Sequence, residues 1–471
     1  MTFFAMAYII ALNPLIIGTA TDVKGNLISG APKFTDAAMT QVDGAAVGAS
    51  IAMVAAVTAL IGGLMTILMG VVGRFPIGLA AGLGLNAMLA YVIAPQMTWP
   101  QAMGLVVIEG IVITILVLTG FREAVFRAVP KPLRVAISVG IGMFITFVGL
   151  VDAGIVRKAA GTPVELGIYG TLRGWPIAIF VIGFILLLVL QARQVRGSML
   201  ISILVATGLA VVVEAIGKFG PAGADNAEGW MLNVPALPEK FIVAPDFSLL
   251  GRVDLVGAFK VEGVIAAGAI LTATMLVFSL MLADFFDTMG TIVAVGAEGD
   301  LLNENGEPEH LREVLIVDSV AAIAGGLGSA SSNTSYIEST AGVAEGARTG
   351  LASVVTGALF LVAVFLSPIM NIVPSEAVAP VLVFVGYLMM SQVPQIKWND
   401  IEEAVPAFVT IVMMPFTYSI TVGIGAGFVT FVLLKIFRGK VKEIHGLMWV
   451  VAAMFTVYFV QGIISDWITQ I

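Results

Sequence analysis

Two aspartates, Asp284 and Asp287, occur in the string ADFFDTMGT, directly after a long apolar run. A spacing of three residues places both on one face of a helix, whereas Phe285 and Phe286 point elsewhere. An aspartate at the centre of a bilayer costs about 2.5 to 3.5 kcal/mol on insertion scales, so an acid that is kept there is functional by default. The pair could take up and release a proton. The alternative is that one or both lie at the membrane edge or cap a neighbouring helix.

A third acid and an amide lie in two other apolar segments. Glu338 ends the string SYIE at 335–338, which matches the S/T-x-x-E capping box, so its simplest role is to close the first turn of a helix. A helix that begins at mid-membrane also presents free N–H groups, which suit a ligand rich in carbonyl and ring-nitrogen acceptors. A carboxylate beside them would accept from the ligand's own N–H groups. Asn86 offers a donor and an acceptor, with bonding to nearby loose backbone as the alternative.

The remaining reactive residue types exclude several other chemistries. The chain has no cysteine, and its two histidines, His310 and His445, lie in polar loops. No histidine can therefore relay protons at membrane depth, and no nucleophile–base pair is evident there. We expect no cofactor, no metal centre, no enzyme activity and no nucleic-acid partner. Three other acids in apolar segments, Glu109, Asp318 and Glu214, are expected to be structural or close to an interface.

Composition places these residues in a membrane protein. Of 471 residues, 59% are hydrophobic and 11% are charged, and the mean hydropathy is +1.04. A soluble protein of this size would carry about 25% charged residues. Apolar runs near the spanning length of roughly 20 residues recur along the whole chain. The chain opens inside such a run without a charged leader, so no cleavable signal peptide is expected, and a native N-terminal extension could be missing.

The apolar runs form two sets of seven, separated by a polar loop at 217–261. One additional run at 446–464 could cross the bilayer or lie on its surface. Lysine and arginine collect in loops that are cytoplasmic if the N-terminus is cytoplasmic, which is the orientation we expect. The candidate spans are 1–18, 45–72, 77–95, 101–120, 132–152, 174–192, 198–216, 262–290, 313–328, 336–348, 350–368, 376–392, 403–419 and 421–437.

Two of these spans are interrupted by small and polar residues, at 75–93 and at 324–349. Irregular backbone at membrane depth persists only where protein or a wet cavity satisfies its polar groups. Each interrupted span is the third of its set, and paired interruptions point to the binding site of a transporter. Because each set has an odd number of spans, the two halves are expected to be inverted repeats.

The strings around these residues carry a family resemblance over nearly the whole chain. They are FFAMAYIIALNPLIIG at 3–18, GLGLNAMLAYVI at 82–93, ADFFDTMGTIVAVGAEGDL at 283–301 and SSNTSYIESTAGVAEGARTGL at 331–351. In these strings the chain resembles the nucleobase–cation symporters of the xanthine/uracil permease superfamily. The closest likeness is to the AzgA-like branch of adenine/guanine/hypoxanthine permeases.

The resemblance implies an all-α polytopic fold of about fourteen segments in two inverted repeats of seven, with short strands in segments 3 and 10. It implies a core domain at 1–120 and 262–368, a gate domain at 121–216 and 369–437, and an extracytoplasmic loop at 217–261. The stretch 438–471 lies beyond that plan as an extra C-terminal helix. A homodimer in the cell membrane is also implied.

The resemblance further implies proton-coupled import of purine bases, with protons rather than sodium as the coupling ion. Asn86, Asp284 and Glu338 would contact the base, and Gly84, Thr334 and Ser335 complete the expected binding set. Asp284, Asp287 and Glu338 are the expected proton-coupling acids. The alternative is carriage of another small solute, such as uracil, xanthine or an inorganic or organic anion. An anion carrier would place basic residues at the site, and none is seen there.

Overall fold

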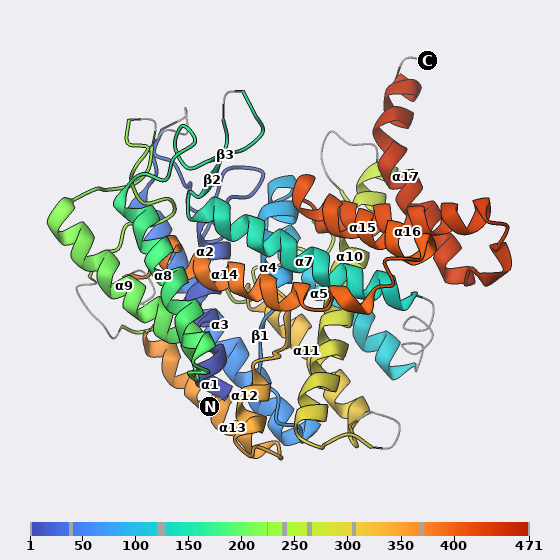
Figure 1. The fold of residues 1–471 in the computed structure, drawn as a ribbon, viewed down its shortest axis with the longest axis horizontal. Helices are drawn as coiled ribbons and strands as arrows, with labels where there is room; N and C mark the ends of the chain where they lie inside the picture. The colour runs from blue at the N-terminus through green and yellow to red at the C-terminus, as the bar shows by residue number, and fades with distance from the viewer. Residues whose placement is uncertain are drawn as a thin grey trace.

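The computed structural model describes residues 2–36, 41–119, 129–159, 161–223, 225–237, 243–260, 266–303, 308–366 and 372–469. These residues form a mainly helical membrane protein (Figure 1). The helices of the first half are α1 (Thr2–Met6), α2 (Ile9–Thr19), α3 (Gly44–Leu68), α4 (Leu83–Met88), α5 (Trp99–Leu118), α7 (Lys131–Asp152), α8 (Trp175–Ala192) and α9 (Ser198–Gly217). Those of the second half are α10 (Ala266–Glu298), α11 (Leu311–Leu327), α12 (Ser339–Ala344), α13 (Leu351–Ala363), α14 (Ser375–Met390), α15 (Ile401–Phe416), α16 (Ile420–Phe437) and α17 (Gly446–Thr469).

Each predicted span corresponds to a helix or to a broken helical segment. Within the described ranges, nine helices are long and apolar enough to cross a membrane, and three shorter apolar helices accompany them. The length and composition of the helices therefore do not establish the predicted count of fourteen membrane-spanning segments, because several of the segments are short or interrupted. Helix α10 continues to Glu298, beyond the predicted end near 290. Asp284 and Asp287 consequently lie inside a helix and not at its end.

The two interrupted spans meet as a two-stranded antiparallel sheet. Strand β1 (Leu79–Ala81) precedes α4, and β4 (Asn333–Ser335) precedes α12. Leu79 pairs with Ser335, and Ala81 pairs with Asn333. This confirms the expected strands in both segments. Antiparallel pairing of equivalent segments is the arrangement that inverted repeats produce around an axis in the membrane plane.

Hydroxyl groups of neighbouring helices satisfy the backbone around β1. Thr66 Oγ1 donates to Leu79 O at 2.9 Å and accepts from Leu79 N at 2.8 Å. Ser353 Oγ lies 2.8 Å from Phe75 O and 2.9 Å from Ile77 O. Ser339 Oγ accepts from Gly78 N at 3.0 Å. Extended backbone is therefore stable at this depth, because side chains supply the hydrogen bonds that lipid cannot.

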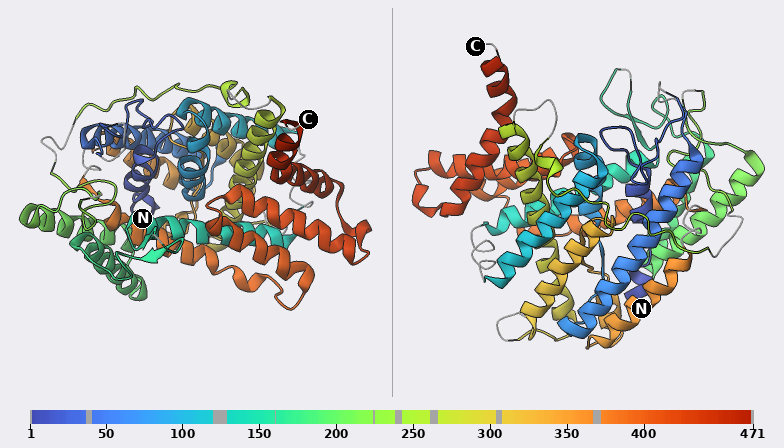
Figure 2. Two further views of the ribbon diagram at one scale, coloured as in Figure 1. Left: turned by 90° about the horizontal axis from the view of Figure 1, so that it is seen from above. Right: turned by 180° about the vertical axis from the view of Figure 1, so that it is seen from behind.

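The long helices pack into two layers, which Figure 2 shows from above. In one layer α3 packs on α2 and α13, and α5 packs on α11 and α10. In the other, α7 packs on α14 and α15, α8 packs on α9 and α14, and α15 packs on α16. Helix α4 and helix α10 both touch α7, so the broken segment that contains α4 and the helix that carries Asp284 lie where the layers meet.

The extra C-terminal helix α17 packs on α16 and α10. The ring centroid of Phe455 lies 6.2 Å from that of Phe278 and 6.3 Å from that of Phe428. One aromatic side chain of α17 therefore bridges helices of both layers.

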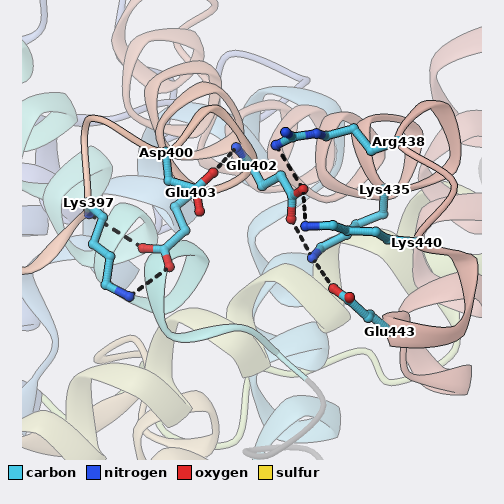
Figure 3. A network of polar contacts seen from close by, with 8 residues as sticks. All are labelled: Lys397, Asp400, Glu402, Glu403, Lys435, Arg438, Lys440 and Glu443. Atoms are coloured by element: carbon cyan, nitrogen blue, oxygen red, sulfur yellow. Dashed lines mark hydrogen bonds and ion pairs between the residues drawn. The ribbon is translucent and has the colours of Figure 1, made fainter.

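A cluster of charged side chains joins the ends of α15 and α16 (Figure 3). The Glu402 carboxylate receives Lys435 Nζ at 2.6 Å, Arg438 Nη1 at 2.9 Å and Lys440 Nζ at 2.6 Å. Only 7% of the Glu402 side chain is exposed, whereas the neighbouring pair between Lys397 and Glu403 is longer, at 3.6 Å, and more exposed. Glu402 therefore links the start of α15 to the end of α16 through three basic side chains.

Candidate functional site

Asp284 lies on α10 beside the two strands and is fully buried. Its Oδ2 atom receives no hydrogen bond within the described residues, and its Oδ1 atom lies 3.5 Å from Thr288 Oγ1, at the limit of a hydrogen bond. A buried carboxylate normally has its lone pairs satisfied. Asp284 therefore has acceptor capacity available for a ligand or for a proton.

Asp318 of α11 organises the hydroxyl groups next to Asp284. Its Oδ2 atom accepts from Thr288 Oγ1 at 2.8 Å, and its Oδ1 atom accepts from Ser335 Oγ at 2.7 Å. Thr334 Oγ1 lies 2.7 Å from Thr288 Oγ1, so it belongs to the same chain of hydrogen bonds. Asp318, which the sequence analysis expected to be structural or close to an interface, lies among the predicted site residues.

Asn86 of α4 is held by a second amide, that of Asn13 in α2. Asn86 Nδ2 donates to Asn13 Oδ1 at 3.0 Å, and Asn13 Nδ2 in turn donates to Thr58 Oγ1 at 2.8 Å and to Ala330 O at 3.1 Å. Asn86 Oδ1 receives no hydrogen bond within the described chain, although the residue is fully buried. The sequence alone did not predict a role for Asn13. Its position inside the apolar run IIALNPLIIG could have indicated a buried polar residue.

Glu338 does not close a capping box. It occupies the N-cap position of α12 without a side-chain cap hydrogen bond, and Ser335 belongs to β4, where its hydroxyl donates to Asp318. That prediction is wrong because the segment is extended up to Ser335. The hydroxyl of Tyr8 instead donates to Glu338 Oε1. Asp287, one turn after Asp284 on α10, interacts electrostatically with Glu338, so these two acids form a neighbouring group.

Glu109 of α5 is a further acid that sequence reasoning assigned to structure. It is fully buried, and its Oε2 atom accepts from Ser332 Oγ at 3.1 Å. Its carboxyl group interacts with that of Asp284. Glu109 thus borders the predicted site directly.

Gly84 lies where α4 approaches α7. A Cβ atom at this position would lie 2.5 Å from Ile141 Cγ2, which is closer than real side chains allow. The role of Gly84 in this structure is therefore close contact between the two layers.

Part of the site is closed to solvent, whereas Gly84, Asp287 and Glu338 are half-buried. Asn86, Asp284, Thr334 and Ser335 are each at most 2% exposed. Two surface hollows of about 380 and 450 Å³ lie in the loops around Asp22 and Met231, and no predicted site residue lines either of them. Within the described ranges, no group of three or more His, Cys, Asp or Glu side chains could hold a metal ion.

The sequence of this chain matches a known protein family and several of its members. A family model described as a permease family, that of the xanthine/uracil permeases, matches residues 37–426. The guanine/hypoxanthine permease PbuG of Bacillus subtilis is 34% identical over 98% of this chain and 94% of its own length. The adenine permease AdeQ of Escherichia coli is 35% identical over 96% of this chain and 90% of its own length.

Solved structures share the fold at low sequence identity. The transmembrane domain of a cyanobacterial bicarbonate transporter, BicA, aligns with a TM-score of 0.54 at 14% identity, covering 90% of this chain and 96% of that domain. The murine anion transporter Slc26a9 aligns with a TM-score of 0.56 at 13% identity, covering 91% of this chain and 68% of that one. With its family match and its nearly full-length relatives, this multi-pass membrane protein belongs to the xanthine/uracil permease family.

Proposed function

We propose that this protein imports purine nucleobases, namely adenine, guanine and hypoxanthine, together with protons. Support comes from relatives named as guanine/hypoxanthine and adenine permeases. The observation that carries the proposal is the pair of buried acceptor atoms, Asn86 Oδ1 and Asp284 Oδ2, that receive no hydrogen bond in the described chain. A purine has N–H donors that must be paired once it leaves water.

The residues of the expected binding set have distinct parts in this proposal. Asp284 and Asn86 accept from the N–H groups of the base, and Thr334 orients Asp284 through Thr288. Ser335 holds Asp318 in place and does not itself bind the base. Glu338, positioned by Tyr8, contacts the other edge of the purine, and Gly84 allows α4 to move close to α7.

Transport would proceed by movement of one helix layer against the other. We assign residues 1–120 and 262–368 to the core domain, and residues 121–216 and 369–437 to the gate domain. The two packing layers in Figure 2 support this division, since α4 and α10 contact the second layer through α7. Alternating exposure around a fixed mid-membrane site is the mode that inverted-repeat carriers use.

The same proposal places the protein in the cell membrane, with a cytoplasmic N-terminus, as a carrier and not as an enzyme. A homodimer is part of the proposal through the family resemblance alone. Sodium is the less favoured coupling ion, because the site presents several carboxyl groups that can hold a proton.

Uptake of radiolabelled hypoxanthine into cells that lack their own nucleobase carriers tests the function. Saturable uptake should compete with unlabelled adenine and guanine and should stop when a protonophore is added. Competition by uracil or xanthine alone would redirect the substrate assignment to those bases. Absence of uptake of every base, with protein present at the cell surface, would refute the proposal.

Variants of the site give the residue-level test. Asp284→Ala and Glu338→Ala should each abolish uptake at normal surface levels, because both acids pair with the base. Glu313→Ala, an exposed acid at the start of α11, is the matched control and should transport normally. Wild-type uptake in both site variants would contradict the assignment.

A further inference from the structure

We infer that Glu109 of α5 and Asp284 of α10 hold one proton between them, and that this shared proton is the one that crosses the membrane with the base. The inference rests on the proposed function, and it narrows the expected proton-coupling set of Asp284, Asp287 and Glu338 to Asp284 and adds Glu109 as its partner.

The geometry of the two carboxyl groups is the first support. Both residues are fully buried, on helices that pack together, and their carboxyl groups interact with each other. Glu109 Oε1 and Asp284 Oδ2 each receive no hydrogen bond from the described chain. Two ionised carboxylates in this arrangement would repel each other without solvent to screen them, so one of the two retains a proton.

The hydrogen-bond donors around the two carboxyl groups also indicate that the pair holds a proton. The single hydroxyl hydrogen of Ser332 goes to Glu109 Oε2, and that of Thr288 is best placed for Asp318, at 2.8 Å, and not for Asp284, at 3.5 Å. The hydroxyl of Thr334 lies against both Thr288 and Asp284. Each hydroxyl supplies one hydrogen, and Glu109 Oε1 and Asp284 Oδ2 receive none in the described chain, so a proton held between the two interacting carboxyl groups would supply the missing donor.

The charged surroundings favour keeping that proton. Helix α5 packs against α10, α11 and the turn Gly257–Phe259, and the titratable groups that face Glu109 from these elements are Asp284 and Asp318. Both Asp318 oxygens accept hydroxyl hydrogen bonds, which is the pairing that an ionised carboxylate requires. Within the described ranges, neither Glu109 nor Asp284 interacts with a lysine or arginine.

The proton couples to the base through Asp284. When the proton resides on Glu109, Asp284 can be ionised and can accept a purine N–H without facing a second negative charge. The proton enters from external water onto a carboxylate oxygen and leaves to cytoplasmic water after the base, and no bond within the base breaks. Because linkage is reciprocal, base affinity must then fall as the pair loses its proton.

Glu109→Gln is the direct test, since glutamine keeps the acceptor for Ser332 and can donate to Asp284 as a protonated acid would. In wild-type cells a proton-coupled carrier gains about 50-fold accumulation per 100 mV of membrane potential. We expect Glu109→Gln to lose accumulation but to keep exchange of internal for external hypoxanthine. Hypoxanthine affinity of the purified variant should become independent of pH, whereas that of the wild type falls as pH rises.

Two further variants separate coupling from structure. Glu109→Asp keeps the carboxyl group and should restore part of the accumulation. Glu298→Gln, an exposed glutamate at the end of α10, is the matched control and should behave as wild type. Protonophore-sensitive accumulation and wild-type pH dependence in Glu109→Gln would overturn the inference while leaving the proposed function in place.

If Glu109→Gln does not reach the membrane, a measurement on the wild-type protein tests whether a proton binds together with the base. Calorimetry of hypoxanthine binding in two buffers of different ionisation enthalpy counts the protons taken up, and we expect up to about one per base above neutral pH. Binding with no proton uptake across the pH range would overturn the inference. Absence of hypoxanthine binding would instead refute the proposed function itself.

Discussion

The hydroxyl of Tyr91 donates a hydrogen bond to Asp152 Oδ2 at 3.1 Å. Tyr91 follows α4 in the π-helical turn Leu89–Ile93, and Asp152 ends α7, so the bond joins the two helix layers. The ring of Tyr418 packs against Tyr91, with centroids 6.1 Å apart. Lys33, from the loop after α2, faces the same carboxylate; burial lowers the pKa of this lysine, and Asp152 acts in the opposite direction. This side of the site is closed by contacts between the layers.

Replacing Tyr91 with phenylalanine should loosen that closure. A hydrogen bond to a carboxylate contributes about 1.5 kcal/mol or more, so its loss should shift the closed–open equilibrium about tenfold. The chain has no cysteine, so a single Val92→Cys probe, next to Tyr91, reports opening without background. Labelling of intact cells by an impermeant maleimide should become about tenfold faster in Tyr91→Phe. Tyr387→Phe, an exposed tyrosine of α14, is the control, and equal labelling rates in both variants would exclude the closure role.

Replacing Thr288 with valine should weaken base binding. The substitution preserves shape but removes the donor to Asp318 and the contact to Thr334. Loss of a hydrogen bond to a charged group costs about 1.5 to 3 kcal/mol, or roughly ten- to hundredfold in affinity. Hypoxanthine binding to the purified variant measures this loss.

The same helix offers a matched control for Thr288→Val. Thr274 donates to the carbonyl of Ile270 in its own helix, at 2.7 Å, and makes no contact with the site acids in the described structure. Thr274→Val should therefore bind hypoxanthine as wild type does. If Thr288→Val also bound normally, the hydroxyl chain around Asp318 would have no part in recognition.

Replacing Gly84 with alanine should slow transport more than it weakens binding. The added methyl group would meet Ile141 of α7, and such overpacking costs about 1 to 3 kcal/mol. Because the clash exists only when α4 and α7 are close, the expected result is a lower maximal uptake rate. Gly208→Ala, where nothing lies within 4 Å of the added carbon, should leave uptake unchanged. An identical decrease in both variants would show that general helix effects are responsible.

Replacing Glu402 with glutamine should destabilise the contact between the start of α15 and the end of α16. Three basic side chains, Lys435, Arg438 and Lys440, would lose the carboxylate that they share (Figure 3). The melting temperature of the detergent-purified protein should fall clearly. Glu403→Gln removes a longer and more exposed pair with Lys397 and should change the melting temperature little, as surface ion pairs contribute little. Equal melting temperatures for the two variants would contradict the central role of Glu402.

The sequence by itself determined the membrane setting and the order of the segments. Apolar runs of spanning length are local features, and so are the glycine, serine and asparagine residues that interrupt 75–93 and 324–349. A lipid environment tolerates such interruptions only at satisfied sites, so the prediction of where the site lies rests on one-dimensional information. The predicted spans 403–419 and 421–437 imply a break near 420, and it lies between Phe416 and Ile420 in the structure.

Only the tertiary structure decided which polar atoms meet. Ser335 and Glu338 matched a local capping pattern, yet pairing of β4 with β1 held Ser335 extended and directed its hydroxyl to Asp318. Glu109 lies far from Asp284 along the chain, and no periodicity shows that α5 packs against α10. A buried acid takes its role from the donors around it, and those donors come from helices that the fold alone brings together.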